Sequence, residues 1–325
     1  MKKRNFLAGA AVLACAPLAL AQGGYPSKPI TFIVPTPAGG GVDVLARTLA
    51  DEMSKKMGQP IIVDNRPGAA GMIGAQTVAR AAPDGYTVLV THSGPVLTAP
   101  YMFSKVAYDV RRDLAFVTQL CTGQLVLAVN PQKVPATDMK EFVRWAGQNK
   151  GKVSYGSYGI GSSGHLMSAY LSSSRQLEMT HVAYKGEAAM AQDLVGGQIE
   201  WGIGSVGTLA PFIANGRLRA LGVMGDKRPA DLPDVPTLAE QGMKDPEFTP
   251  LGWVAVFTTA NTPAPVLQRL EQETRAAVQT TAMKARFQAF GMEPMGTSSA
   301  EFRREYDAQL PMVERLVKLS GAKVD

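Results

Sequence analysis

Apolar positions along this chain alternate between two spacings, one typical of buried strands and the other of helices. Short β-branched runs, which favour strands, occur at residues 29–34, 60–64 and 86–91. Between them, apolar side chains recur every three or four residues at 42–57 and again near 72–82. Strands that alternate with helices predict a mainly parallel sheet with helices on both faces, so the expected fold class is α/β.

The alternation stops in the middle of the chain and then starts again. Two extended runs, 114–120 and 124–130, follow each other with no helical pattern between them. Strand and helix patterns resume between 137 and 224, and a proline-rich stretch with few periodic signals follows at 226–250. A length of 325 residues also favours two domains over one.

We therefore expect two α/β lobes. The first lobe is predicted to hold residues 22–122 together with a returning segment, 241–325, and the second lobe residues 123–240. Each lobe is predicted to be a mainly parallel sheet flanked by helices, with the ligand cleft between the lobes. The two stretches in which the chain crosses between lobes, near 121–125 and 226–250, are the expected hinges.

Two helix starts are indicated by capping residues near the C-terminus. Thr262 precedes Pro263, which is the order of an N-cap residue and a first-turn proline. Ser298 and Glu301 have the spacing of a capping box. We therefore expect helices to begin directly after Thr262 and after Ser298.

The first 21 residues have the organisation of a secretory signal peptide. Basic residues at 2–4 precede an apolar run at 6–20, and Ala19-Leu20-Ala21 forms a cleavage pattern. The apolar run is shorter than the roughly 18 residues that a membrane span requires. We therefore expect a periplasmic protein of residues 22–325, and a lipid-anchored N-terminus at Cys15 is the alternative.

Charge and cysteine content exclude several classes of site. The full chain carries a net charge of +6, and removal of the signal peptide leaves +3, too small a surplus for the basic face of a nucleic-acid-binding protein. Cys121 is the only cysteine after residue 21, so the mature chain cannot form an internal disulfide. The three histidines lack metal-ligand spacing, so neither a metal nor another cofactor is expected.

Three loops rich in glycine and hydroxyl residues follow predicted strands. They lie at 35–41, 91–94 and 155–165. Ligands of open α/β sheets bind where strands run into helices, and the N–H groups at helix starts favour anions. We therefore expect the first and third loops to face each other across a cleft and to hold an anion, with Ser93 of the second loop nearby.

A hydrolase is the rival interpretation of the third loop. Its sequence Gly161-Ser162-Ser163-Gly164-His165 misses the nucleophile elbow G-x-S-x-G by one residue. A serine and a histidine two residues apart do not by themselves make a catalytic triad. A phosphate-binding loop and a Rossmann fingerprint are also missing from the sequence. A binding module is favoured, with an exported serine hydrolase and a ligand-sensing partner of a membrane sensor as alternatives.

Several separated motifs occur in order along nearly the whole mature chain. They are PITFIVP at 29–35 with GGVD at 40–43, VDNRPGAAG at 63–71, APDGYT at 82–87, YGS at 155–157 with GSSGHL at 161–166, VAYKG at 182–186, DLVGGQ at 193–198, LPDVPT at 232–237 and TPAPV at 262–266. In these motifs the chain resembles the periplasmic substrate-binding proteins of tripartite tricarboxylate transporters, also called Bug receptors. The resemblance implies a two-lobed, periplasmic-binding-protein-like fold. It also implies a monomeric solute-binding protein that closes on a small organic carboxylate and delivers it to a membrane permease.

The resemblance also implies which residues contact the ligand. By position it points to Gly40, Gly41, Asp43, Ser157, Gly161, Ser162, Ser163 and His165, with Tyr184 and Lys185 nearby. Ser93 and Ser205 join this set because they follow strands of the two lobes. Backbone N–H groups and hydroxyls are the expected donors, Lys185 is expected to steer anions, and no residue has a catalytic role.

The chain departs from the family pattern after one strand of the second lobe. Many family members have an Asp-Asn pair where this chain has Gly204 and Ser205. Loss of the acidic side chain argues against an amino-acid ligand, whose ammonium group needs a carboxylate partner, and leaves space. Tyr158, Trp201 and Trp253 are expected to pack in the core, but any that faces the cleft would favour an aromatic carboxylate.

Overall fold

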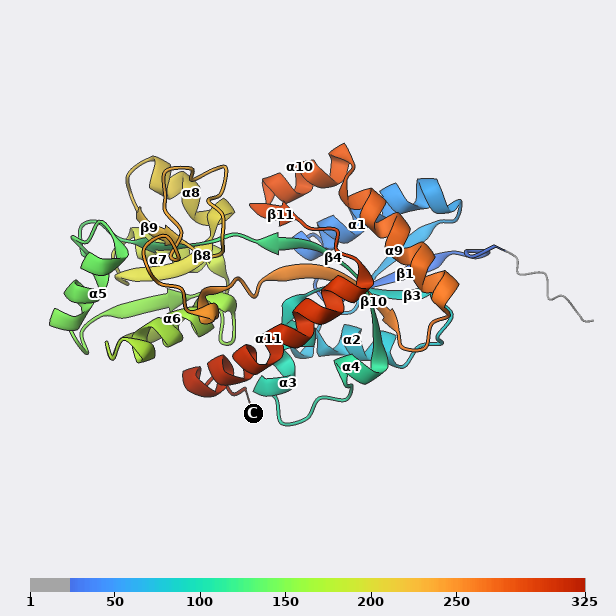
Figure 1. Cartoon of the computed structure of the whole chain (residues 1–325), viewed down its shortest axis with the longest axis horizontal. Helices are drawn as coiled ribbons and strands as arrows, with labels where there is room; N and C mark the ends of the chain where they lie inside the picture. The colour runs from blue at the N-terminus through green and yellow to red at the C-terminus, as the bar shows by residue number, and fades with distance from the viewer. Residues whose placement is uncertain (1–23, 325) are drawn as a thin grey trace, which may run out of the picture.

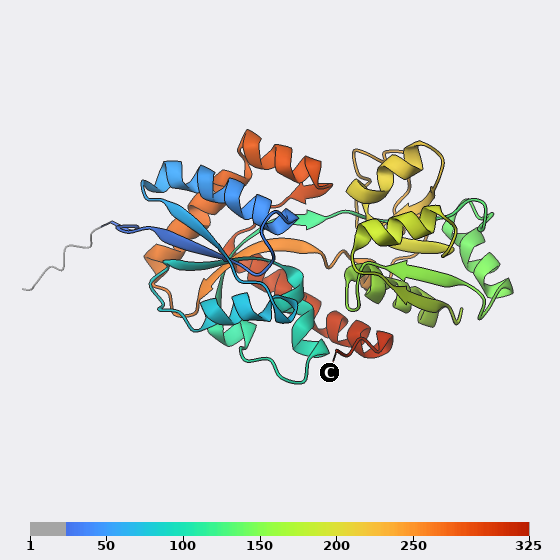
Figure 2. The ribbon, with the colours of Figure 1, turned by 180° about the vertical axis from the view of Figure 1, so that it is seen from behind.

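The computed structural model describes residues 24–324. It has two α/β lobes side by side, shown along their length in Figure 1 and from behind in Figure 2. The predicted signal peptide, 1–21, and Cys15 lie outside the described residues. Within the described range, no helix combines the length and the apolar character that crossing a membrane requires.

The sheet of lobe 1 has six strands in the order β11-β4-β10-β3-β1-β2. Their bounds are β1 (Ile30–Val34), β2 (Ile61–Asn65), β3 (Thr87–His92), β4 (Leu114–Gly123), β10 (Trp253–Thr259) and β11 (Met292–Pro294). Strand β1 is parallel to β2 and β3, whereas β10 is antiparallel to β3 and β4, and β11 is antiparallel to β4. Every residue of β10 is buried, as expected for a strand in the middle of a covered sheet.

The sheet of lobe 2 has five strands in the order β7-β6-β8-β5-β9. Their bounds are β5 (Leu125–Val129), β6 (Ser154–Ser157), β7 (Thr180–Ala183), β8 (Trp201–Ser205) and β9 (Arg219–Val223). Strand β6 is parallel to β7 and β8, whereas β5 is antiparallel to β8 and β9.

The strands of each sheet run mainly in one direction, as predicted, but the sheets are mixed, because β10 and β11 in lobe 1 and β5 in lobe 2 run against the others. The reason lies in the connections between the lobes. Strand β4 of lobe 1 passes almost directly into β5 of lobe 2, and the chain later returns into β10. These crossings take the place of the βαβ units that keep neighbouring strands parallel. Consequently β5 and β10 run antiparallel to both of their neighbours.

Helices cover both faces of each sheet. Their bounds are α1 (Gly41–Met57), α2 (Met72–Ala79), α3 (Ala99–Met102), α4 (Val110–Asp113), α5 (Met139–Gln148), α6 (Ser163–Ser174), α7 (Glu187–Val195), α8 (Val206–Ala214), α9 (Ala264–Val278), α10 (Thr281–Ala289) and α11 (Ser299–Ser320), with short helical turns η1 (Ala69–Gly71), η2 (Gly94–Thr98) and η3 (Pro246–Phe248). In lobe 1, α1, α9 and α10 pack on one face of the sheet, and α2 and α11 on the other. In lobe 2, α7 and α8 pack on one face and α5 and α6 on the other.

The C-terminal helix α11 contacts both lobes. It begins with the predicted capping box, in which Ser298 and Glu301 exchange hydrogen bonds. Its first turns pack on β4, where Phe116 meets Phe302 and Tyr306 edge to face with ring centroids 5.0 Å apart. Its later part packs against α6 of lobe 2, as Figure 1 shows. The helix therefore joins the two sheets through one continuous apolar core.

The predicted start of α9 is wrong by one residue. Pro263 stands at the N-cap position and the helix begins at Ala264. The Thr262 hydroxyl donates to the Thr259 carbonyl at 2.8 Å and caps nothing. A threonine hydroxyl can bond either to an N–H group of the following helix or to a carbonyl of the preceding turn, and here it bonds to the turn.

Candidate functional site: a cavity between the two lobes

A cavity of about 720 Å³ lies between the sheets and is lined by loops from both lobes. The loops after β1, β2 and β3 contribute Pro35, Pro37, Val42, Pro67, Gly68, Ala70, Gly71, His92, Ser93 and Gly94. The loops after β6 and β8, with the start of α7, contribute Tyr158, Gly159, Ile160, Gly161, Ser162, Ser163, Glu187 and Ser205. Its size is that of a small-molecule site, which spans about 300–1,000 Å³.

Four helix N-termini border this cavity. Gly71, Ser93, Ser162 and Ser205 are the N-cap residues of α2, η2, α6 and α8, and each lines it. The first N–H groups of a helix have no carbonyl partner within the helix, and the helix dipole places partial positive charge there. Both lobes thus direct the positive ends of helices at one space, which suits an anion.

Five of the residues predicted from the sequence line the cavity. They are Ser93, Gly161, Ser162, Ser163 and Ser205. Seven others lie near these loops but outside the cavity wall: Gly40, Gly41, Asp43, Ser157, His165, Tyr184 and Lys185. The contacts of this second group show that several of them hold the lining loops in place.

Asp43 ties together two loops of lobe 1. Its side chain is only 3% exposed, and its Oδ2 accepts from the Gly39 N–H at 2.8 Å and from Arg47 Nε at 3.0 Å. Its Oδ1 accepts from Asn65 Nδ2 at 2.9 Å. Burial acts to raise the pKa of Asp43, but the hydrogen bonds from Arg47, Gly39 and Asn65 outweigh it and hold that pKa below its ordinary value. The carboxylate therefore fixes the loop that leads into α1.

A stacked pair of imidazoles, one buried (His165) and one partly buried (His181), lies behind the loop 158–162 of lobe 2. The rings of His165 and His181 stack with centroids 3.8 Å apart and an interplanar angle of 13°. His165 Nδ1 accepts from the Gly161 N–H at 3.1 Å, and Ser157 Oγ lies 2.7 Å from His181 Nε2. Ser162 caps α6, because its Oγ accepts from the backbone N–H of His165 at 3.2 Å. These contacts fix the loop from behind, and they leave Ser163 on the cavity wall.

Tyr184 and Lys185 do not line the cavity. The Tyr184 hydroxyl donates to Asp193 Oδ2 at 2.9 Å, which joins β7 to α7. Lys185 is exposed. Trp201 is fully buried, as predicted, whereas Tyr158 and Trp253 both line the cavity. Burial, together with the charge of Glu187, raises the pKa of Tyr158 to about 12.

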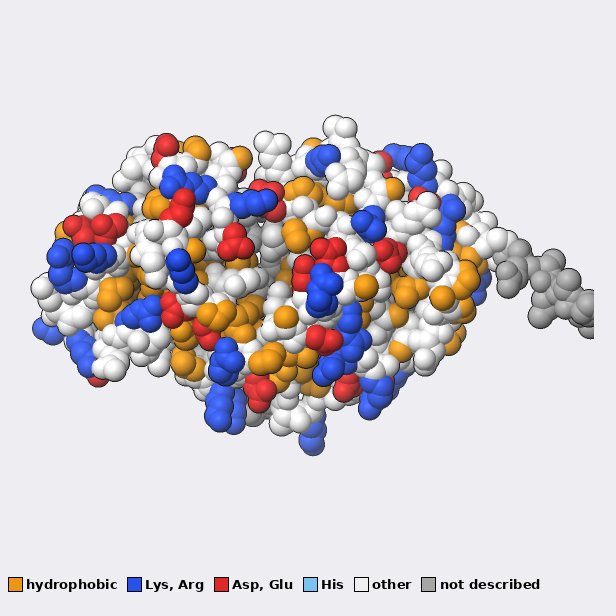
Figure 3. All heavy atoms as spheres, in the orientation of Figure 1, with side chains coloured by type: hydrophobic (Ala, Val, Ile, Leu, Met, Phe, Trp, Pro, Cys, Tyr) orange, Lys and Arg blue, Asp and Glu red, His pale blue; other side chains and the backbone are white. Residues whose placement is uncertain are grey.

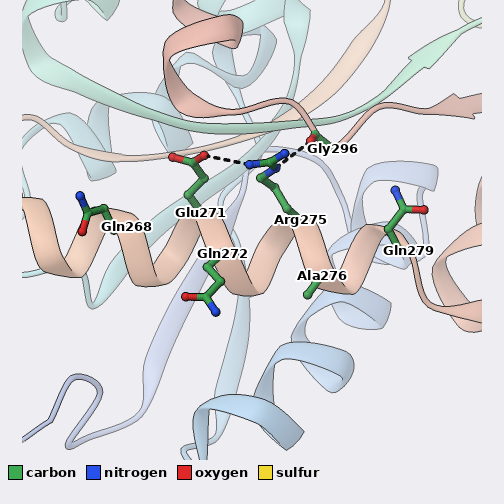
Figure 4. A pocket seen from close by; sticks show the side chains of 7 residues that line it. All are labelled: Gln268, Glu271, Gln272, Arg275, Ala276, Gln279 and Gly296. Atoms are coloured by element: carbon green, nitrogen blue, oxygen red, sulfur yellow. Dashed lines mark hydrogen bonds and ion pairs between the residues drawn. The ribbon is translucent and has the colours of Figure 1, made fainter.

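A second hollow, of about 450 Å³, lies on the outer surface of lobe 1 along α9. Figure 4 shows its long polar side chains, which project from successive turns of the helix. Arg275 Nη1 lies 3.4 Å from Glu271 Oε1, and Arg275 Nε donates to the Gly296 carbonyl at 3.0 Å. Figure 3 shows similar mixtures of acidic and basic side chains across the face it draws. Charges that pair with one another on one exposed helix form an ordinary solvated surface.

A family profile described as "Tripartite tricarboxylate transporter family receptor" matches residues 45–321. The chain belongs to this receptor family. It is 32% identical over 301 residues to the protein BugT of Bordetella pertussis, covering 92% of this chain and 91% of BugT. A TctC solute-binding protein from Polaromonas has a TM-score of 0.81 at 27% identity, covering 91% of this chain and 99% of that one. A structure described as R. palustris Rpa4515 with adipate has a TM-score of 0.75 at 29% identity, covering 92% and 99%. The predicted family and the two-lobed fold are thereby confirmed.

The receptor lines its cavity with one loop that the sequence analysis did not include in the site. Pro67, Gly68, Ala70 and Gly71 contribute to the wall between β2 and α2. Ala69 and Ala70 have φ values of 46° and 53°, which is uncommon for alanine and concentrates at functional sites. The small residues of this loop were visible in the sequence, but nothing in their pattern showed that the loop turns toward lobe 2.

A decrease from about pH 6.5 to pH 5 is expected to destabilise the receptor through His165. Burial, with a further contribution from the neighbouring His181, lowers the pKa of His165 from 6.5 to about 4. Between these values the unfolded chain binds more protons than the native one. The contribution of neutral His165 to the free energy of unfolding is therefore fully present above about pH 6.5, and it is lost as the pH decreases toward 4. The expected loss by pH 5 is about 2 kcal/mol from this residue.

Thermal unfolding across this pH range measures the effect. His165→Asn keeps an acceptor for the Gly161 N–H but cannot titrate, so its melting temperature should fall less steeply than that of the wild type. If the melting temperatures of the wild type and His165→Asn decrease equally with pH, the buried imidazole of His165 does not cause the loss of stability.

Proposed function

We propose that this receptor captures a small organic carboxylate between its lobes and delivers it to the integral-membrane permease of a tripartite tricarboxylate-type transporter. The observation that carries the proposal is the convergence of four helix N-termini from both lobes on one cavity. Such N–H groups bind an anion without a metal or a covalent step, so the ligand can be released unchanged. Residues 1–21 would direct the chain to the periplasm, where the ligand is met.

Capture in this proposal depends on closure of the two lobes. Lobe 1 is assigned residues 22–122 and 241–325, and lobe 2 residues 123–240. A ligand that contacts both lobes favours the closed arrangement by the free energy of the contacts that only this arrangement allows. Gly123, the last residue of β4, and Gln124, which separates β4 from β5, supply one of the two crossing points at which such a motion would bend.

The serine-hydrolase alternative has less support. Ser157 and His181 are in hydrogen-bond contact at 2.7 Å, but Ser157 is fully buried and does not line the cavity. Among the described residues, His181 has no carboxylate hydrogen-bond partner that could orient it as in a triad. Ser162 and Ser163, which do line the cavity, have no hydrogen bond to a histidine ring within residues 24–324.

A thermal-shift screen with mono-, di- and tricarboxylates, and with the neutral amide of each acid as control, tests the proposal. A ligand at about 100 times its Kd should stabilise the folded receptor by about 2.7 kcal/mol, and the amide should not. Hydrolysis of an ester or amide, with no stabilisation by any carboxylate, would overturn the receptor proposal in favour of the enzyme.

A further inference from the structure

Glu187 gives the cavity a negative charge at its lobe 2 end. It is the first residue of α7 and, among the described residues, the only Asp, Glu, Lys or Arg that lines the cavity. Its Oε1 accepts from the backbone N–H of Ser205, and its Oε2 accepts from Ser205 Oγ at 2.7 Å and Thr208 Oγ1 at 2.8 Å. Ser205 is the N-cap residue of α8. The protein's own carboxylate therefore occupies the anion site that the N-terminus of α8 would otherwise offer to a ligand.

Gly204 makes room for this arrangement. A Cβ atom at position 204 would lie 2.9 Å from Glu187 Oε1 and 2.9 Å from Leu209 Cδ1, closer than such atoms approach in proteins. Any larger residue at 204 would force the Glu187 carboxylate away from the Ser205 N–H. Gly204 and Glu187 thus act together, and the space left by the missing side chain is filled by a carboxylate from another element.

The part of the chain that the structure describes places no cation against Glu187. Within residues 24–324 it takes part in no ion pair, and the neighbouring Lys185 is exposed and outside the cavity wall. The hydrogen bonds from Ser205 and Thr208 stabilise the carboxylate without neutralising its charge. A second negative charge brought to this end of the cavity would meet a like charge in a partly buried space, which is strongly unfavourable.

The wall between the open helix N-termini and Glu187 is largely apolar. Met102 and Phe103 come from the end of α3, Trp253 and Val254 from β10, and Ile160 from the loop before α6. Polar ligand groups placed against these side chains would lose their hydration without gaining a partner. Apolar groups would gain from the same contact, and the Trp253 ring suits a flat or extended hydrocarbon.

From these observations we infer that the ligand is a monocarboxylate with an apolar body, and that Glu187 is the specificity residue that disfavours di- and tricarboxylates. This inference rests on the proposed function, because it concerns the same cavity. The single carboxylate binds at the N-termini of α2 and α6, which no protein carboxylate occupies among the described residues, and the body extends over the apolar wall toward Glu187.

Calorimetric titration of the whole mature protein with matched pairs of acids tests the inference. Hexanoate is compared with adipate, and benzoate with terephthalate, so that each pair differs by one carboxylate. The wild type should bind the monocarboxylate of at least one pair about tenfold or more tightly than its dicarboxylate. Glu187→Gln keeps the shape and removes the charge, and should reduce that ratio about tenfold.

Glu200→Gln is the matched control. Glu200 also accepts hydrogen bonds from a serine N–H and hydroxyl, those of Ser154 at 2.7 Å each, but it does not line the cavity. It should leave the ratio unchanged. If the wild type binds adipate or terephthalate as tightly as its monocarboxylate partner, or if Glu187→Gln leaves the ratio unchanged, this inference is overturned while the receptor proposal stands. If the wild type binds none of the four acids, this inference is overturned, and the receptor proposal is then decided by the wider carboxylate screen.

Discussion

Replacement of Gly161 by leucine is expected to lower the affinity for the carboxylate by about 100- to 1,000-fold. Gly161 has a φ of +75°, where any residue with a Cβ is strained. A Cβ there would lie 2.2 Å from both Sδ and Cε of Met102, a residue of α3 in the other lobe. The leucine would fill the cavity and push the 158–162 loop away from lobe 1. Overpacking of the cavity is expected to cost about 3–4 kcal/mol in the closed, ligand-bound state, whereas the backbone strain is present with and without ligand and lowers only the stability.

The same backbone conformation occurs at a site where the space is open, which provides a control. Gly216 also has a φ of +75°, it lies in the same lobe, and a Cβ there would meet nothing within 4 Å. Gly216→Leu introduces the same backbone strain without obstructing the cavity, so its ligand affinity should match the wild type. Equal affinities for Gly161→Leu and Gly216→Leu, measured by calorimetry, would show that the 158–162 loop is not part of the binding site.

Asp43→Ala is expected to lower the free energy of unfolding by about 2–3 kcal/mol and to weaken ligand binding as well. The substitution removes three hydrogen bonds to a carboxylate that is only 3% exposed. Among the described residues, the loop into α1 then keeps only one side-chain hydrogen bond, from Asn65 Nδ2 to the Thr36 carbonyl, so Pro37 and Val42 are held less firmly on the cavity wall. If the loop becomes ordered only when the ligand binds, the affinity decreases, because the free energy needed to order the loop offsets part of the free energy gained from the ligand contacts.

Asp64→Ala is the corresponding control, since Asp64 lies on the neighbouring strand but is 34% exposed and pairs only with the exposed Arg66. Exposed ion pairs contribute little, so this variant should stay within about 0.5 kcal/mol of the wild type. Denaturant unfolding monitored by circular dichroism gives both values. Asp43→Ala with the stability and affinity of Asp64→Ala would exclude a positioning role for Asp43.

The sequence predicted those parts of the fold that depend on local pattern. The α/β alternation, the capping box at Ser298 and the loops after β1 and β6 all follow from spacing and residue type, and they agree with the structure. The mixed direction of the sheets could not be predicted in this way. Strand direction depends on how the chain passes between lobes, and the apolar runs of β5 and β10 read the same whichever way they pair.

The candidate site also has residues that could be predicted from the sequence and one that only the fold reveals. Gly161, Ser162 and Ser163 were predicted from the family resemblance, and Ser93 and Ser205 from their place after strands, and all five line the cavity. Glu187 was not predicted, because in the sequence it is one acidic residue in the first turn of a helix, where such residues commonly stabilise the helix dipole. Its role depends on its contact with Ser205, which lies 18 positions away in sequence. Only the fold brings the two together.

The central claim is that one carboxylate is held by helix N-termini of both lobes in a single cavity. A crystal structure of the mature protein with an acid selected by the thermal-shift screen tests this claim most directly. We expect carboxylate oxygens about 3 Å from backbone N–H groups at the N-termini of α6 and α2, and the lobes closed around the ligand. A ligand bound outside this cavity, or held by one lobe alone, would contradict it.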